Sequence, residues 1–86
     1  MVERKITVKN KTGIHARPAS ELVKECSKFK SNVFIKTEDK KINAKSILNI
    51  LSAGIVQGTN ITLCTEGEDE VEALEIVSSF VNNLID

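Results

Sequence analysis

Aromatic side chains are scarce in this 86-residue sequence, and its charges of opposite sign cancel. Tyrosine and tryptophan are absent, and the only aromatic residues are Phe29, Phe34 and Phe80. Twelve basic and twelve acidic residues give a formal net charge of zero. Domains that bind nucleic acids commonly stack bases on aromatic rings and attract phosphates with a basic surface. A small nucleic-acid-binding α/β domain is therefore a weak alternative, and we expect no nucleic acid partner.

Few cysteines and no long apolar run exclude two further classes. Cys26 and Cys64 lie far apart, without CxxC spacing or a neighbouring histidine, so we expect buried free thiols rather than a zinc or redox site. No stretch approaches the roughly 18 apolar residues of a membrane-spanning helix. The segment from Met1 to Ile6 does not resemble a signal peptide. We expect a cytoplasmic protein without membrane insertion.

The sequence also has no motif that would activate a nucleotide or a metal-bound water. It contains no Gly-rich phosphate cradle, no nucleotide-binding motif and no cluster of metal-binding carboxylates. This argues against a self-contained phosphotransferase or phosphatase, and we expect neither a metal nor a cofactor. Any phosphate chemistry would then depend on partner enzymes.

The apolar pattern predicts an α+β fold in one domain over residues 1–86. Alternating apolar residues indicate strands, and apolar residues three and four apart indicate helices. Asp69 and Glu72 resemble a capping box in front of the last helix. The resulting order is βαββαβα, which suits an antiparallel sheet with helices on one face, although periodicity does not determine the strand order. The predicted strands cover residues 2–9, 32–36, 41–43 and 60–66, and the predicted helices cover 16–28, a short stretch from 47, and the chain after 69.

The single histidine of the chain precedes the first predicted helix. Histidine side chains can act as nucleophiles, and the neutral ring nitrogen of an imidazole such as that of His15 can attack phosphorus. The first N–H groups of a helix have no intrahelical acceptor, and the helix dipole favours a negative charge there. A lone histidine in this place is nevertheless more often a cap or a surface side chain than a nucleophile. From these residues alone both interpretations stay open.

The residues around His15 suit phosphate binding. Arg17 offers a planar fork of donors to phosphate oxygens, and the amides of Ala16 and Arg17 begin the helix. Pro18 falls in the first turn, where its missing N–H removes no hydrogen bond. Gly13 gives the approaching loop conformational freedom. These features predict a local anion site beside a nucleophile.

The stretch GIHARPAS at residues 13–20 is similar to the active-site signature of the HPr family, the histidine-containing phosphocarriers of the bacterial phosphoenolpyruvate:sugar phosphotransferase system. A second stretch, INAKSILNILS at residues 42–52, and the element order extend the resemblance over essentially the whole chain. The resemblance implies an open-faced sandwich of four antiparallel strands and three helices. It implies a protein that is not itself an enzyme: enzyme I phosphorylates His15, with phosphoenolpyruvate as the ultimate donor, and the phosphoryl group passes to the A component of a sugar permease. Arg17 would be the phosphate-binding partner.

Two features refine this resemblance. Some regulatory members of the family lack the histidine, so the presence of His15 indicates a member able to transfer phosphate. A carrier of the nitrogen-related branch is an alternative, but the Lys45-Ser46-Ile47 context favours the sugar branch.

Ser46 has both a structural and a regulatory interpretation. It precedes the apolar residues of the short helix, where serine is a good N-cap. Its surroundings also resemble the regulatory serine site of Gram-positive HPr, which a dedicated kinase/phosphorylase modifies, and this implies a role in carbon catabolite regulation. A phosphate there would add roughly 1.5 to 2 negative charges at a helix N-terminus. Both roles are compatible with one serine.

The short helix carries more apolar residues than one of its faces can bury. We expect some of Ile47, Leu48 and Leu51 to be exposed and to form a protein-docking surface, against the alternative that they are core or isolated surface residues. Ser20 and Lys24, together with Arg17, would form its polar rim. Family members commonly have methionine or phenylalanine at the position of Leu48 and larger apolar residues at those of Ala44 and Ala53, which concerns partner fit. We expect a monomer.

Overall fold

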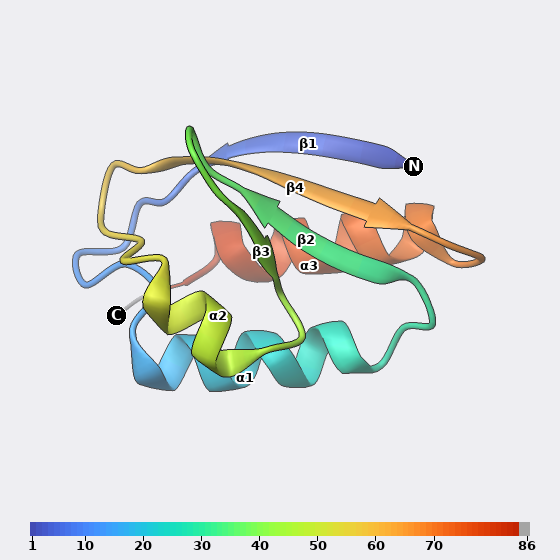
Figure 1. Cartoon of the computed structure of the whole chain (residues 1–86), viewed down its shortest axis with the longest axis horizontal. Helices are drawn as coiled ribbons and strands as arrows, with labels where there is room; N and C mark the ends of the chain where they lie inside the picture. Colours follow the sequence, from blue (N-terminus) through green and yellow to red (C-terminus); the bar gives the residue numbers. More distant parts are fainter. Residues whose placement is uncertain (85–86) are drawn as a thin grey trace.

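The computed structural model describes residues 1–84 as a four-stranded antiparallel sheet covered on one face by three helices (Figure 1). The strands run in the spatial order β1-β4-β2-β3. This confirms the predicted α+β open-faced sandwich and supplies the strand order; residues 85 and 86 of the expected domain lie outside the described part. The elements are β1 (Val2–Thr7), α1 (Ala16–Ser27), β2 (Asn32–Lys36), β3 (Lys41–Asn43), α2 (Ile47–Ser52), β4 (Asn60–Glu66) and α3 (Glu70–Asn82).

Alternate residues of each strand face the helices and form the core. Ile6 of β1 pairs with Ile61 of β4, and Ile35 of β2 pairs with Leu63 of β4, so these apolar side chains form rows on the helical face. All four are at most 6% exposed, and their removal from water is a main source of stability. The helices complete the core with residues that include Ala19, Leu22 and Cys26 of α1, Ile50 of α2, and Ala73, Val77 and Val81 of α3.

The first strand is shorter than its alternation predicts. The expected strand covers residues 2–9, whereas β1 ends at Thr7. Hydrogen bonding nevertheless continues past this point, because Val8 N donates to Thr59 O at 3.0 Å and Gly58 N donates to Val8 O at 2.8 Å. Val8 is therefore buried as expected, and the chain leaves the sheet only as it turns at Asn10.

The open face of the sheet is covered only by its own long side chains. Glu3 and Lys36 form an ion pair of 2.7 Å across β4, whose Cys64 stands between their strands. Cys64 is buried although it lies on this face, and burial raises the pKa of its thiol. Cys26 is buried on the core-facing side of α1, where desolvation raises the pKa of its thiol to about 12. Both cysteines are free and buried, as predicted.

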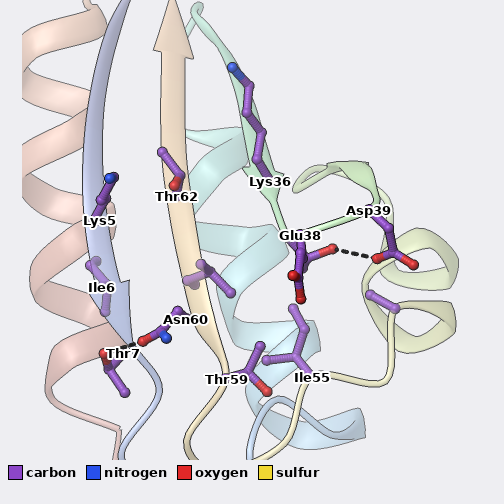
Figure 2. A pocket seen from close by; sticks show the side chains of 13 residues that line it. Lys5, Ile6, Thr7, Lys36, Glu38, Asp39, Ile55, Thr59, Asn60 and Thr62 are labelled. Atoms are coloured by element: carbon purple, nitrogen blue, oxygen red, sulfur yellow. Dashed lines mark hydrogen bonds between the residues drawn. The ribbon is translucent and has the colours of Figure 1, made fainter.

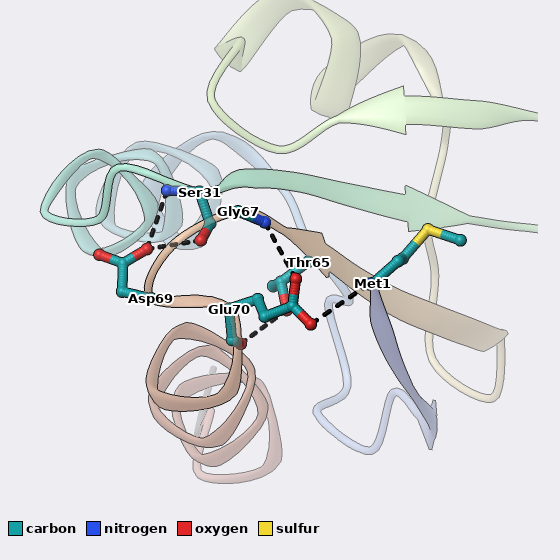
Figure 3. Close-up of polar contacts among 6 residues, drawn as sticks. All are labelled: Met1, Ser31, Thr65, Gly67, Asp69 and Glu70. Carbon is teal, nitrogen blue, oxygen red and sulfur yellow. Dashed lines mark hydrogen bonds and ion pairs between the residues drawn. The ribbon is translucent and has the colours of Figure 1, made fainter.

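The predicted capping box at the start of α3 is wrong. Asp69 precedes the helix, but its side chain makes no cap hydrogen bond within α3. Its carboxylate instead accepts bonds from the backbone amides of Lys30 and Ser31, at 3.0 and 2.9 Å, and from the Ser31 hydroxyl (Figure 3). Glu70 binds the Gly67 amide at 3.1 Å. Asp69 therefore joins the loop after α1 to the start of α3.

Asp69→Asn should destabilise the fold in a pH-dependent way. The three donors, the Ser31 hydroxyl first, hold the pKa of Asp69 at about 2, below the ordinary aspartate value. Asp69 thus contributes stability that is complete above pH 5 and is lost as the pH falls from there towards 2. Urea unfolding at several pH values should show a wild-type advantage over Asp69→Asn that shrinks in this interval.

The control is Asp39→Asn, since Asp39 lies in the turn between β2 and β3, where its carboxylate accepts a long 3.4 Å contact from the Thr37 hydroxyl. A wild-type advantage over Asp69→Asn that stays constant from pH 7 to 2 would contradict the assignment.

Candidate functional site

His15 occupies the N-cap position of α1 with its imidazole exposed. The residue has an extended backbone (φ −96°, ψ −164°), and its carbonyl accepts the first helical bond, from Ala19 N at 2.9 Å. Its side chain makes no capping hydrogen bond, so the structural interpretation of this histidine as a side-chain cap does not hold. The ring is available to a reagent from solvent.

The loop before His15 is held by three hydrogen bonds. Asn10 Nδ2 donates to Gly13 O at 2.6 Å and Gly13 N donates to Asn10 O at 3.1 Å, which closes a tight turn. Ile14, which is buried, donates from its amide to Ile55 O at 3.0 Å. Gly13 lies so close to the backbone there that a Cβ on it would stand 2.3 Å from Ile55 O, and its φ is +65°. The segment between α2 and β4 therefore supports the start of α1.

The first turn of α1 offers unused donors for an anion. Within residues 1–84, no backbone acceptor binds the amides of Ala16 or Arg17, and Pro18 has no N–H to satisfy. No acidic residue lies in this turn. Two amides at the positive end of the helix dipole can therefore bind phosphate oxygens beside His15.

The Arg17 guanidinium is engaged with a carboxylate one helical turn further on. Arg17 Nη1 lies 2.9 Å from Glu21 Oε1, and the two side chains are 53% and 45% exposed. Among the predicted rim residues, Ser20 is partly buried and Lys24 is exposed in the last turn of α1. Glu21 was not among the predicted site residues, although its i, i+4 spacing from Arg17 is visible in the sequence.

Helix α2 packs beside α1 and exposes part of its apolar surface (Figure 1). Ile47, Leu48 and Leu51 are 39%, 73% and 40% exposed, while Ile50 is fully buried. We call Ile47, Leu48 and Leu51 of α2 the apolar patch. The segment that follows α2 includes Ile55, whose carbonyl binds the loop before His15, and Val56, which is 59% exposed.

Ser46 is the N-cap of α2, as predicted. Its hydroxyl oxygen accepts bonds from the Asn49 amide at 3.3 Å and from Asn49 Nδ2 at 2.9 Å. The preceding Lys45 donates from Nζ to the Phe29 carbonyl near the end of α1, at 2.9 Å. The segment that carries Ser46 is thus bonded to α2 and to the loop that follows α1.

A groove of about 810 Å³ lies elsewhere, at the end of the sheet (Figure 2). Lys5 and Lys36 line it together with Glu38 and Asp39, so its charges are mixed, and it does not include His15. Nowhere in residues 1–84 do three or more histidine, cysteine or acidic side chains gather as ligands for a metal. None of the helices described here has the length and apolarity needed to cross a membrane.

The sequence matches a known family along most of its length. The model of the PTS HPr component phosphorylation site matches residues 2–83. HPr-like protein Crh of Halalkalibacterium halodurans is 49% identical over 81 residues, which are 94% of this chain and 96% of that protein. Phosphocarrier protein HPr of Xylella fastidiosa is 41% identical over 83 residues, which are 96% of this chain and 93% of that protein.

Solved structures of HPr and Crh proteins have a similar fold. HPr of Thermoanaerobacter tengcongensis superposes with a TM-score of 0.91 at 45% identity and covers 95% of this chain and 92% of its own. An HPr dimer from the same organism gives a TM-score of 0.75 at 45% identity, covering 95% and 94%. Crh of Bacillus subtilis, described as a dimer with a swapped domain, gives 0.79 at 44% identity, covering 100% and 99%.

The open-faced sandwich with an exposed histidine at the start of a helix fits a family of small proteins that carry phosphoryl groups and are not themselves enzymes. The chain belongs to the HPr family of the phosphotransferase system. Family membership supports phosphohistidine as the chemistry of this fold, and the resemblance to Crh, the catabolite repression HPr of Bacillus subtilis, supports a link to carbon catabolite regulation.

Gly13→Ala should destabilise the protein more than Gly54→Ala. Both glycines have a positive φ, +65° and +63°, where an alanine costs about 1 to 2 kcal/mol. A Cβ at Gly54 meets nothing within 4 Å, whereas one at Gly13 collides with the backbone of Ile55 and Val56. We expect Gly13→Ala to lose about 1 to 3 kcal/mol beyond its control.

Urea unfolding measures the free energy difference, and the amide shifts of Ile14 and Ile55 report whether the loop has moved. Equal losses in the two variants would contradict the proposed close approach at Gly13.

Proposed function

We propose that this protein is a phosphocarrier that accepts a phosphoryl group on His15 and passes it on. The observation that supports this most directly is the exposed, uncapped imidazole of His15 beside the free amides of Ala16 and Arg17. A neutral ring nitrogen is the nucleophile, and the helix N-terminus together with the Arg17 guanidinium stabilises the negative oxygens of the bound phosphoryl group.

Enzyme I is the proposed donor, with phosphoenolpyruvate as the ultimate source, and the A component of a sugar permease is the proposed acceptor. The family matches support phosphotransferase partners in general. A shallow, exposed site fits this role because a partner must reach the His15 nitrogen in line with the phosphorus on both transfers. All these partners act in the cytoplasm, which we propose as the location of this protein.

Phosphorylation by enzyme I and phosphoenolpyruvate tests this function. Wild-type protein should gain one acid-labile phosphate, and His15→Gln should gain none. Arg17→Lys keeps the charge but loses the planar fork of donors, so its kcat/KM should fall about 10-fold or more.

The matched control is Arg4→Lys, because Arg4, the other arginine of the chain, pairs with Glu75 across β1 and α3. Phosphate on the His15→Gln variant, or equal losses in the two arginine variants, would refute the assigned roles.

We also propose that the apolar patch is a docking surface for these partners, with Arg17, Ser20 and Lys24 on its polar rim. Its exposure on α2, which packs beside α1, supports this, as does the bond between Ile14 and Ile55 that links the segment after α2 to the loop of His15. Phosphorylation of Ser46 by a serine kinase/phosphorylase would place a charge at the edge of this patch and oppose docking through desolvation and repulsion.

Ser46→Asp should therefore raise the KM for enzyme I several-fold while the unfolding free energy changes little, since aspartate is also a good N-cap. The control is Ser79→Asp, which adds the same charge on an exposed position of α3. Initial rates over a full enzyme I titration give both KM and kcat. Identical curves for wild type and Ser46→Asp would count against regulation through docking.

A regulatory role through Ser46 is the second candidate function, because Crh proteins from two organisms are 49% and 47% identical to this chain. Solved structures of Crh and of an HPr are described as dimers. These dimers bear against the expectation of a monomer. Sedimentation of this protein across a concentration series distinguishes the two states.

A further inference from the structure

We propose that Glu21 is a positioning residue that holds the Arg17 guanidinium before phosphorylation and competes with the phosphoryl group for it. The inference rests on the proposed carrier function and deepens it, because it concerns how strongly the site retains its phosphate. The observation that carries it is the 2.9 Å contact between Arg17 Nη1 and Glu21 Oε1 on the same face of α1.

Among residues 1–84, no acidic side chain other than Glu21 forms an ion pair with Arg17. Helix α2, which packs against α1, contains no charged residue between Ile47 and Ser52. The first turn of α1 contains no acidic residue, and the next acidic residue along the helix, Glu25, pairs with Lys28 at 3.1 Å. Within residues 1–84, Glu21 is therefore the one carboxylate that binds Arg17.

Arg17 binds Glu21 more weakly than it would bind a phosphoryl group, so Glu21 reduces phosphate binding by Arg17 without preventing it. An exposed ion pair four residues apart on a helix is weak, whereas charge-assisted bonds from arginine to phosphate oxygens are among the stronger hydrogen bonds. The Arg17 guanidinium therefore binds the phosphoryl group on His15 more strongly than it binds Glu21, but the ion pair with Glu21 must first break. The freed carboxylate then remains on the same helix, six residues from the phosphorylated His15, and repels the dianion, so both effects weaken retention of the phosphate.

A titration of the phosphorylated protein tests this without enzyme I. Phosphoramidate phosphorylates exposed imidazoles directly: the ring nitrogen attacks phosphorus, the P–N bond of the reagent breaks, and ammonia leaves. The ³¹P resonance then reports the midpoint at which the phosphoryl group changes from monoanion to dianion. Glu21→Gln should lower this midpoint by about 0.3 pH units, a twofold change, because Arg17 becomes fully available to the dianion.

Glu25→Gln removes a carboxylate from the next turn without touching Arg17, and its midpoint should stay within about 0.1 pH units of wild type. In an Arg17→Ala background the effect of Glu21→Gln should shrink, because only the repulsion between the Glu21 carboxylate and the phosphoryl group remains to be removed. An unchanged midpoint in Glu21→Gln overturns the proposal, and so does a shift that persists in full without Arg17, since Glu21 would then act by its field alone. Failure of the carrier function appears separately, as absence of phosphorylation by enzyme I.

Discussion

The close approach of Gly13 to the backbone of Ile55 and Val56 is the constraint on which the site depends. Only a residue without a Cβ fits there, and the approach allows Ile14 to donate its amide to Ile55 O. This bond attaches the start of α1, where His15 stands, to the segment that follows α2. The exposed histidine and the apolar patch therefore belong to one rigid unit although 30 or more residues separate them in sequence.

The sequence pattern predicted the elements well because each has a clear apolar side. Val33 and Ile35 are buried and alternate with less buried neighbours, and the apolar residues of α1 recur at helical spacing, so element type and order follow from the local pattern. The order β1-β4-β2-β3 does not follow, because several antiparallel arrangements would bury the same faces. The segment around His15 could be identified because its functional groups lie in a few consecutive residues, 13–20.

The sequence pattern did not predict side-chain contacts between segments that lie far apart in the chain. Asp69 was expected to cap α3, but its carboxylate instead accepts hydrogen bonds from the amides of Lys30 and Ser31, almost 40 residues earlier in the chain. Cys64 is buried as its residue type predicts, but the sequence pattern does not predict the Glu3–Lys36 pair that lies across it on the open face of the sheet. The Arg17–Glu21 pair is different: its spacing is local and visible, but its significance depends on the position of His15.

A carrier needs a site that holds phosphate loosely, and the geometry around His15 fits that requirement. A buried pocket lined by several fixed cations would stabilise the phosphohistidine so strongly that donation to an acceptor would slow. Here two backbone amides and one half-exposed arginine provide the attraction, and that arginine is shared with Glu21. Water competes for every one of these donors, which limits their net contribution. In the proposed carrier function, this weak retention leaves the phosphoryl group available to an acceptor.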